Sequence, residues 1–264
     1  SLATAVIAMP PFTPLMEWGE ELSLSLTLTF ENFAYLFEDD LYVRAYLNSL
    51  KLAAISTVLC LLIGYPMAYG IARAPRNLRM ILLLMVILPF WTSFLLRIYA
   101  WMGLLNKNGI INAILINLGL IDQPLQMMFT EGAIYVGIVY SYLPFMILPL
   151  YANMEKLDNS LNEAAEDLGA KPITRFVTVT LPLTKPGIIA GALLVFIPAT
   201  GEYVIPALLG SQNTLMIGRV LFDEFFTNRD WPVASAVAIV LLVVLVVPIM
   251  IYQHYQGKQA EAEG

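Results

Sequence analysis

The chain has 264 residues, of which 59% are hydrophobic and only 13% charged, and its mean hydropathy is +0.73. A soluble domain of this length needs more polar surface than that, so a membrane is the expected solvent. The formal net charge of −6, together with a sequence that contains no basic stripe, argues against a nucleic-acid-binding surface.

The N-terminal part of the chain begins at Ser1 with the apolar run Leu2–Met9. This run is too short to cross a bilayer or to act as a complete signal peptide, so we expect the natural N-terminus to lie upstream. The single cysteine, Cys60, lies in a later apolar run. One cysteine permits neither an internal disulfide nor a cysteine-based metal site, and Cys60 is expected to be a packing residue.

Five long apolar segments are expected to cross the membrane as helices, since a spanning helix needs about 20 apolar residues. In chain order they are Leu52–Ala72, Met80 through Arg97 to about Leu105, Gly132–Met154, Pro186–Leu209 with Glu202 inside it, and Trp231–Gln253. Membrane helices tolerate the prolines in these segments, because neighbouring helices satisfy the freed carbonyls. Gly187 and Gly191 have the spacing of a close helix contact. The sequence therefore predicts an all-α integral membrane protein.

The charges between these segments predict their orientation. The turn Arg73–Arg79 holds three arginines and no acid, which places it in the cytoplasm. Alternation then puts residues 155–185 inside, and the predicted inner loops carry eight Lys and Arg against four in the outer ones. We expect a periplasmic segment over residues 1–44, a transmembrane domain over 45–254 and a cytoplasmic tail over 255–264.

The predicted inner loop 155–185 is too long for a simple connection and is expected to be structured. Ser160 and Glu163 have capping-box spacing, which predicts a short helix that starts at Ser160. The helix would continue through Ala164, Ala165 and Leu168 and stop at Gly169, which can adopt the left-handed conformation. The small alanines beside Leu168 predict a surface that another protein can approach closely; an ordinary surface turn is the alternative.

This loop resembles a known family signature. Glu163-Ala164-Ala165 is followed after three residues by Gly169 and after nine more by Val179-Thr180-Leu181-Pro182. The pattern is similar to the signature loop of ATP-binding-cassette importer permeases, in which Val179 is usually Ile. The resemblance implies the type I importer permease fold in the bacterial inner membrane. It also implies a missing first span, because permeases of the polyamine group have six helices and this chain shows five.

The resemblance implies a division of labour. The loop residues expected to couple transport to a separate ATPase are Ser160, Glu163, Ala164, Ala165, Leu168, Gly169, Leu181 and Pro182. The sequence contains no phosphate-binding Gly-x-x-x-x-Gly-Lys pattern, so no cofactor is expected in this chain, ATP is expected on the partner, and the chain itself is not expected to be an enzyme. The implied partners are a second, non-identical permease, two ATPase subunits and a periplasmic substrate-binding protein.

The whole chain is most similar to permeases of putrescine and spermidine importers, and the segment around Glu202 to the putrescine branch. A carboxylate buried in a bilayer costs at least about 2.5 kcal/mol, so Glu202 is expected to face protein or a water-filled path that suits a polyamine cation. Other candidate path residues are Tyr203, Trp91 and Tyr99, whose rings can attract an ammonium, and Arg97. Alternatively, Glu202 pairs with Arg97, and the aromatic rings anchor the chain at the membrane interface.

Other functions remain as alternatives. A permease for another small solute fits the same signature loop. A secondary transporter would use an ion gradient, but the sequence shows no inverted repeats. A membrane enzyme is disfavoured, because the sequence has a single histidine, His254, and no cluster of catalytic or metal-binding residues.

Overall fold

The computed structural model describes residues 2–7, 16–18, 24–26, 29–158, 160–211 and 214–263. The chain folds into two compact units, one formed by residues 1–50, 201–203 and 215–264, and the other by residues 51–200 and 204–214. Helix α3, Asp40–Arg73, contributes to both units. The second unit contains most of the predicted functional residues.

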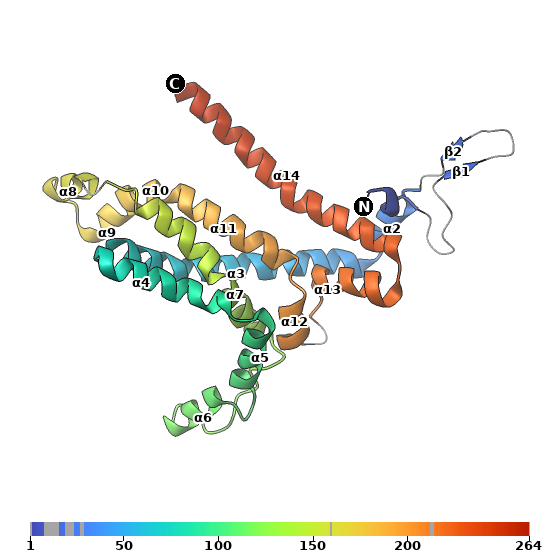
Figure 1. Cartoon of the computed structure of the whole chain (residues 1–264), viewed down its shortest axis with the longest axis horizontal. Helices are drawn as coiled ribbons and strands as arrows, with labels where there is room; N and C mark the ends of the chain where they lie inside the picture. Colours follow the sequence, from blue (N-terminus) through green and yellow to red (C-terminus); the bar gives the residue numbers. More distant parts are fainter. Residues whose placement is uncertain are drawn as a thin grey trace. The chain divides into compact units, whose positions relative to one another are not determined.

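The second unit is a bundle of helices in which α3, α4 and α7 run side by side (Figure 1). After α3 its elements are α4 Arg76–Ile87, η1 Leu88–Trp91, α5 Phe94–Leu105, α6 Ile110–Asn117, α7 Glu131–Met154, α8 Ser160–Asp167, α9 Pro172–Arg175, η2 Phe176–Thr180, α10 Leu181–Leu183, α11 Lys185–Thr200 and α12 Val204–Leu209. Thr130 caps α7 by accepting a hydrogen bond from the Ala133 N–H at 3.2 Å.

The close contact predicted at Gly187 and Gly191 lies between α11 and α7. A Cβ atom at Gly187 would lie 2.8 Å from the Asn153 Cβ, and one at Gly191 would lie 2.8 Å from the Met146 sulfur. Only glycine allows the two backbones this near, as expected of helices that pack in a membrane. Cys60 is fully buried in the apolar cluster at this contact and is a packing residue.

The first unit contains short N-terminal elements and the C-terminal helix. They are α1 Leu2–Ala5, α2 Glu31–Glu38, α13 Ile217–Phe222, the π-helical turn η3 Asp223–Asn228 and α14 Trp231–Glu263. Two three-residue strands, β1 Met16–Trp18 and β2 Leu24–Leu26, pair antiparallel with Met16 opposite Leu26. These two strands were not predicted, since three-residue strands have no detectable alternation, and the predicted helical class holds. Leu36, Tyr42, Ile217 and Val237 belong to the buried core of this unit.

All five predicted apolar segments are helical, but two of them are interrupted. Helices α3 and α7 are each long and apolar enough to cross a membrane alone. The segment Met80–Leu105 bends by 93° after Trp91, where Thr92 is extended and its hydroxyl donates to the Pro89 carbonyl at 2.7 Å. The segment Pro186–Leu209 leaves the helix at 201–203. Within the described residues, Trp231–Val247 at the start of α14 is also an apolar helix.

Candidate functional site

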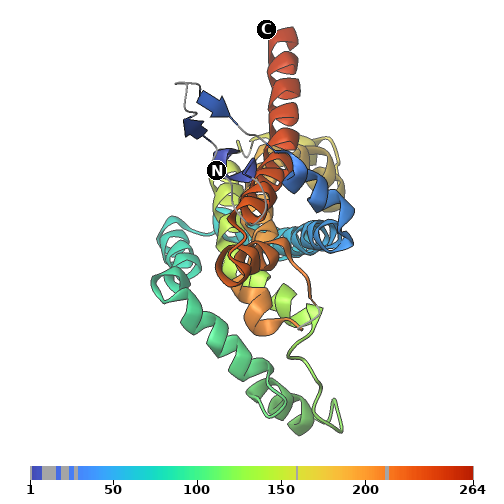
Figure 2. The ribbon, with the colours of Figure 1, turned by 90° about the vertical axis from the view of Figure 1, so that its right-hand side faces the viewer.

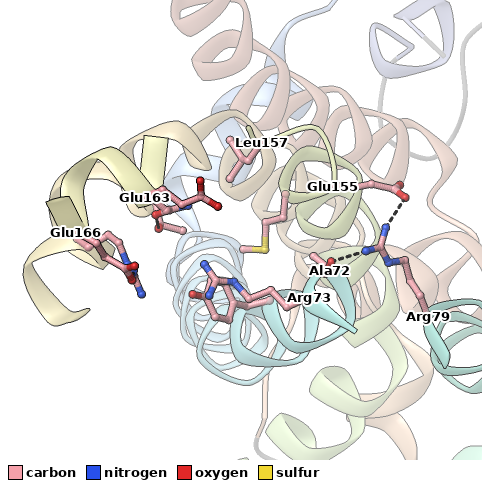
Figure 3. A pocket seen from close by; sticks show the side chains of 12 residues that line it. Ala72, Arg73, Arg79, Glu155, Leu157, Glu163 and Glu166 are labelled. Atoms are coloured by element: carbon pink, nitrogen blue, oxygen red, sulfur yellow. Dashed lines mark hydrogen bonds and ion pairs between the residues drawn. The ribbon is translucent and has the colours of Figure 1, made fainter. Parts of the chain in front are cut away.

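A polar pocket of about 460 Å³ lies at the end of the bundle where the α3–α4 turn meets the loop after α7. Arg79 organises this end. Its guanidinium donates to the Glu155 carboxylate at 2.9 Å and to the backbone carbonyls of Ala72 and Ala74 at 2.8 and 3.3 Å (Figure 3). One side chain thus closes the α3–α4 turn and ties it to the end of α7. A hydrogen bond from Tyr151 and then the charge of Arg79 lower the pKa of Glu155.

Helix α8 begins at Ser160, as predicted, but the structure shows a different cap. The Asp158 carboxylate accepts the Ser160 N–H at 2.9 Å, and this bond, followed by a second from the Ser160 hydroxyl, lowers the pKa of Asp158. Ser160 is therefore the first helical residue, and its hydroxyl points back to Asp158. The predicted reciprocal pair of Ser160 and Glu163 is wrong in this respect. The Ser160 N–H, which Glu163 was expected to accept, is accepted by the Asp158 carboxylate two residues upstream.

Helix α8 stops at Gly169, as predicted. Gly169 has a φ of +79°, its N–H donates to the Glu166 carbonyl at 2.8 Å, and the Ala170 N–H donates to the Ala165 carbonyl at 2.9 Å. This pair of bonds is a Schellman motif, which needs a left-handed residue at the position of Gly169. The chain direction after α8 is thereby fixed.

The two sides of α8 differ in their surroundings. Toward the bundle, Glu166 forms an ion pair with Arg175, and the Asn162 side chain accepts a hydrogen bond from the Thr180 hydroxyl at 3.3 Å. Glu163 lines the pocket, and Figure 3 shows it with Glu166 on one side and Arg73 on the other. Away from the bundle, Leu168 is 89% exposed. An apolar side chain is therefore exposed at the end of α8, while the ion pair and the hydrogen bond attach the helix to the bundle.

The structure divides the predicted loop residues into two groups. Six are exposed on the surface of the loop, namely Ser160, Glu163, Ala164, Leu168, Gly169 and Pro182. Ala165 is half-buried, and Leu181 packs with Phe176 against the apolar cluster around Tyr65. Leu181 thus anchors the end of the loop in the bundle.

The segment around Glu202 leaves the helix between α11 and α12. Glu202 is 8% exposed, and its carboxylate accepts the N–H of its neighbour Tyr203 at 3.1 Å. Gly218 in α13 packs so close that a Cβ there would lie 2.3 Å from the Gly201 carbonyl oxygen. The Tyr203 ring stacks on Phe222, with centroids 4.1 Å apart. The buried Glu202 is thus next in sequence to a tyrosine whose ring stacks on Phe222 of α13.

The other three predicted path residues lie on two consecutive elements, Trp91 on η1 and Arg97 and Tyr99 on α5. Trp91 is 83% exposed and Tyr99 is also exposed. The Arg97 guanidinium lies over the rings of Phe90 and Phe94, at 5.1 and 5.6 Å from their centroids. In the described part of the chain no cluster of three or more His, Cys, Asp or Glu residues has the arrangement of a metal site.

The family model of the binding-protein-dependent transport system inner membrane component matches residues 44–258. The chain belongs to this family. The permease is 48% identical over 225 residues to the spermidine/putrescine transport system permease protein PotB of Haemophilus influenzae, covering 85% of this chain and 78% of that protein. Identity to PotB of Escherichia coli K12 is 43% over 229 residues, which cover 87% of this chain and 83% of the relative.

A solved structure supports the fold of the permease. A chain of a bacterial ABC transporter involved in the import of the acidic polysaccharide alginate superposes with a TM-score of 0.67 and 21% identity, covering 88% of the permease and 84% of that chain. This agreement and the family match confirm the predicted helical fold of type I importer permeases.

Several residues of the permease's pocket were missed by sequence reasoning. Arg79 and Arg73 were read only as charges that set orientation, and Arg175 and Asn162 were not singled out. Glu155 lies 76 positions from Arg79, so no local pattern joins them. Gly218 was missed for the same reason, because its contact with Gly201 is visible only in the folded chain.

Proposed function

We propose that this chain is one permease half of an ATP-driven importer that moves a polyamine into the cytoplasm by alternating access. Its partners in this proposal are a second, non-identical permease, two ATPase subunits that bind the ATP, and a periplasmic binding protein. The family description and the names of the PotB relatives support it. Putrescine is the first candidate cargo.

The observation that carries the proposal is the construction of α8. Leu168 is exposed beside the small Ala164, and the Schellman motif at Gly169 fixes the helix end. An exposed leucine with small neighbours suits insertion into a cleft on another protein. Force applied to α8 would pass through the Glu166–Arg175 ion pair and the Asn162–Thr180 bond into the segment that leads to α11.

The polar pocket also supports the proposed orientation. Residues of the arginine-rich turn and of loop 155–185 line one pocket, so both lie at the same end of the second unit. An arginine-rich turn favours the cytoplasmic side. The proposal therefore places α8 and the C-terminus in the cytoplasm, residues 1–44 in the periplasm, and the ATPases beneath α8.

Leu168→Asp tests the docking role. Leu168 makes little contact within the chain, so the variant should fold and insert normally. A carboxylate in the centre of a protein interface costs several kcal/mol. We expect co-purification of the ATPase subunits and ATP-dependent uptake to fall at least tenfold. Gln123→Asp, which adds the same charge at an exposed site between α6 and α7, is the matched control.

Two outcomes would count against this role. If Leu168→Asp retained both its ATPase partners and its uptake, α8 would not be the docking helix. If uptake by the unmodified complex needed an ion gradient and no ATP, the alternative of a secondary transporter would replace the proposal.

The cargo is proposed from the segment around Glu202. A buried carboxylate close to two stacked rings combines the groups that attract an ammonium, by charge and by cation-π contact. In this proposal Glu202 and Tyr203 contact the passing polyamine and Tyr99 contributes an aromatic face, whereas Trp91 takes the alternative role of an anchor at the membrane interface. The Arg97 guanidinium is held over two phenylalanine rings. On the path, its positive charge would repel the second ammonium of a polyamine and so restrict where that group binds.

Glu202→Gln tests the cargo, because it keeps the shape and removes the charge. A hydrogen bond to a charged group contributes about 1.5–3 kcal/mol, so KM for putrescine should rise about tenfold or more. Uptake of radiolabelled putrescine and spermidine by the reconstituted complex is the measurement. Asp122→Asn, at an exposed position, controls for the loss of a charge as such. If the unmodified complex took up neither polyamine, a permease for another small solute would be the better description.

A further inference from the structure

The polypeptide turns sharply where α4 and η1 end. Arg76–Trp91 is 16 residues long by its numbering, or about 24 Å at the rise of a helix, which is close to the ~30 Å hydrocarbon thickness of a bilayer. Because the segment runs beside the spanning helix α3, its start at the arginine-rich turn puts Trp91 near the opposite interface. Exposed tryptophans are typical of that depth.

Beyond this turn, α5 and α6 run across the direction of α4. The bend between Arg76–Trp91 and Phe94–Asn117 is 93°. Both views show the green segment α5–α6 leaving the bundle crosswise (Figures 1 and 2). If α3 and α4 stand along the membrane normal, α5 and α6 therefore extend along the membrane plane.

Helix α6 exposes large apolar side chains. Ile110, Ile114 and Leu118 follow one another at intervals of four residues, which puts them on one side, and they are 62%, 51% and 67% exposed. Leu120 and Leu125 extend the exposed surface into the following loop. The charged residues Lys107 and Asp122 lie only beyond the two ends of the helix. An apolar surface of this kind is unfavourable in water.

The opposite side of α6 is fixed to its own loop by Asn112. The Asn112 amide donates to the carbonyls of Asn106, Lys107 and Leu125 at 3.3, 3.1 and 3.0 Å, and its oxygen accepts the Leu125 N–H at 2.9 Å. The polar groups of the hairpin are thus satisfied internally. The outward side is left with apolar side chains and, at the last residue of α6, Asn117.

We propose that α6 lies in the plane of the membrane interface opposite the arginine-rich turn, with Ile110, Ile114 and Leu118 among lipid acyl chains. The exposed apolar surface of the end of α4, which includes Met85, continues through Leu88 and Trp91 of η1 into α5. The first charged residue after Met85 is Arg97, and its guanidinium lies over two phenylalanine rings. An outward side with a single polar side chain, Asn117 at the end of α6, suits lipid better than a protein interface, which carries about ten hydrogen bonds. The inference requires only that the permease spans a membrane, so it holds for any cargo.

Spin labels on single cysteines test this placement in the assembled transporter in liposomes. Cys60 is the only cysteine of the chain and is buried, so the Cys60→Ala variant serves as the cysteine-free parent. Any spin-label signal from the complex containing this parent is subtracted. Labels are placed at Ile114→Cys and, separately, Leu118→Cys. Gln123→Cys, exposed at the tip of the same hairpin, is the control. Collision rates with oxygen, which dissolves in lipid, and with a water-soluble nickel chelate are compared.

At Ile114 and Leu118 we expect an oxygen-to-nickel collision ratio severalfold higher than at Gln123. A nickel collision rate equal to that at Gln123 would place α6 in water and overturn the proposal. Low collision rates with both reagents would show that another protein chain covers α6, which also overturns it. Retained uptake by each labelled complex confirms that the labels report on the folded state.

Discussion

Helices α6 and α8 have the same length and end in the same backbone motif, but their exposed side chains differ in character. Each has eight residues, and each ends in a Schellman motif around a left-handed glycine, Gly119 with φ of +68° and Gly169 with φ of +79°. The hydrogen bonds correspond: Gly119 and Leu120 donate to the carbonyls of Ile116 and Leu115, just as Gly169 and Ala170 donate to those of Glu166 and Ala165. The backbone therefore does not decide what either helix contacts.

The side chains make the difference. Helix α6 is held by the buried, neutral amide of Asn112 and exposes isoleucine and leucine, which suits lipid. Helix α8 is held by the Glu166–Arg175 ion pair, by the Asn162–Thr180 hydrogen bond and by Asp158, and the exposed Leu161 and Leu168 lie among charged residues, which suits a protein partner. The same C-terminal stop therefore serves two kinds of surface, and α8, unlike α6, is held in part by charged groups.

Replacing each glycine by valine breaks the shared motif and should have the largest effect. A β-branched residue is strongly disfavoured at positive φ, at a cost of about 1–2 kcal/mol. If α8 couples the motor, Gly169→Val should lower the number of solute molecules imported per ATP hydrolysed about tenfold. Gly119→Val is the matched control, since its backbone strain is the same and it should leave this ratio unchanged. Equal loss in both variants would contradict a specific coupling role for α8.

The sequence predicted the features of this comparison that depend on neighbouring residues. The start of α8 at Ser160 and its stop at Gly169 follow from local chemistry, and so do the five apolar segments. The break after Trp91 and the non-helical residues around Glu202 were not predicted, because each is stabilised by the fold. Gly218 leaves room for the Gly201 carbonyl only after the chain has brought them together.

Removing the Asn112 amide tests how α6 is held. Asn112→Ala leaves the Leu125 N–H and several carbonyls without their partner, at a cost of about 1–3 kcal/mol. We expect amide hydrogen exchange over residues 106–125 to become about tenfold faster, as measured by mass spectrometry. Exchange over Ser160–Leu168 should not change. Raising the salt concentration should instead speed amide exchange over Ser160–Leu168 and leave residues 106–125 unchanged. Salt screens the ion pair that holds α8, whereas the neutral Asn112 amide is not affected.

Asp158 gives the smallest expected effect and a pH signature. Its pKa is lowered in the folded loop by the Ser160 N–H and hydroxyl, so its contribution is complete above the ordinary pKa of aspartate and is lost as pH falls through the lowered value. Below about pH 4, protection of the first turn of α8, corrected for the intrinsic exchange rate, should decrease a few-fold. Asp158→Asn should show the reduced protection at neutral pH and little further change on acidification. Helix α6 has no titrating group in its hydrogen-bond network at Asn112, so its protection should stay constant over the same range. A parallel loss in both helices would mean that acid loosens the whole bundle and that Asp158 is not the cause.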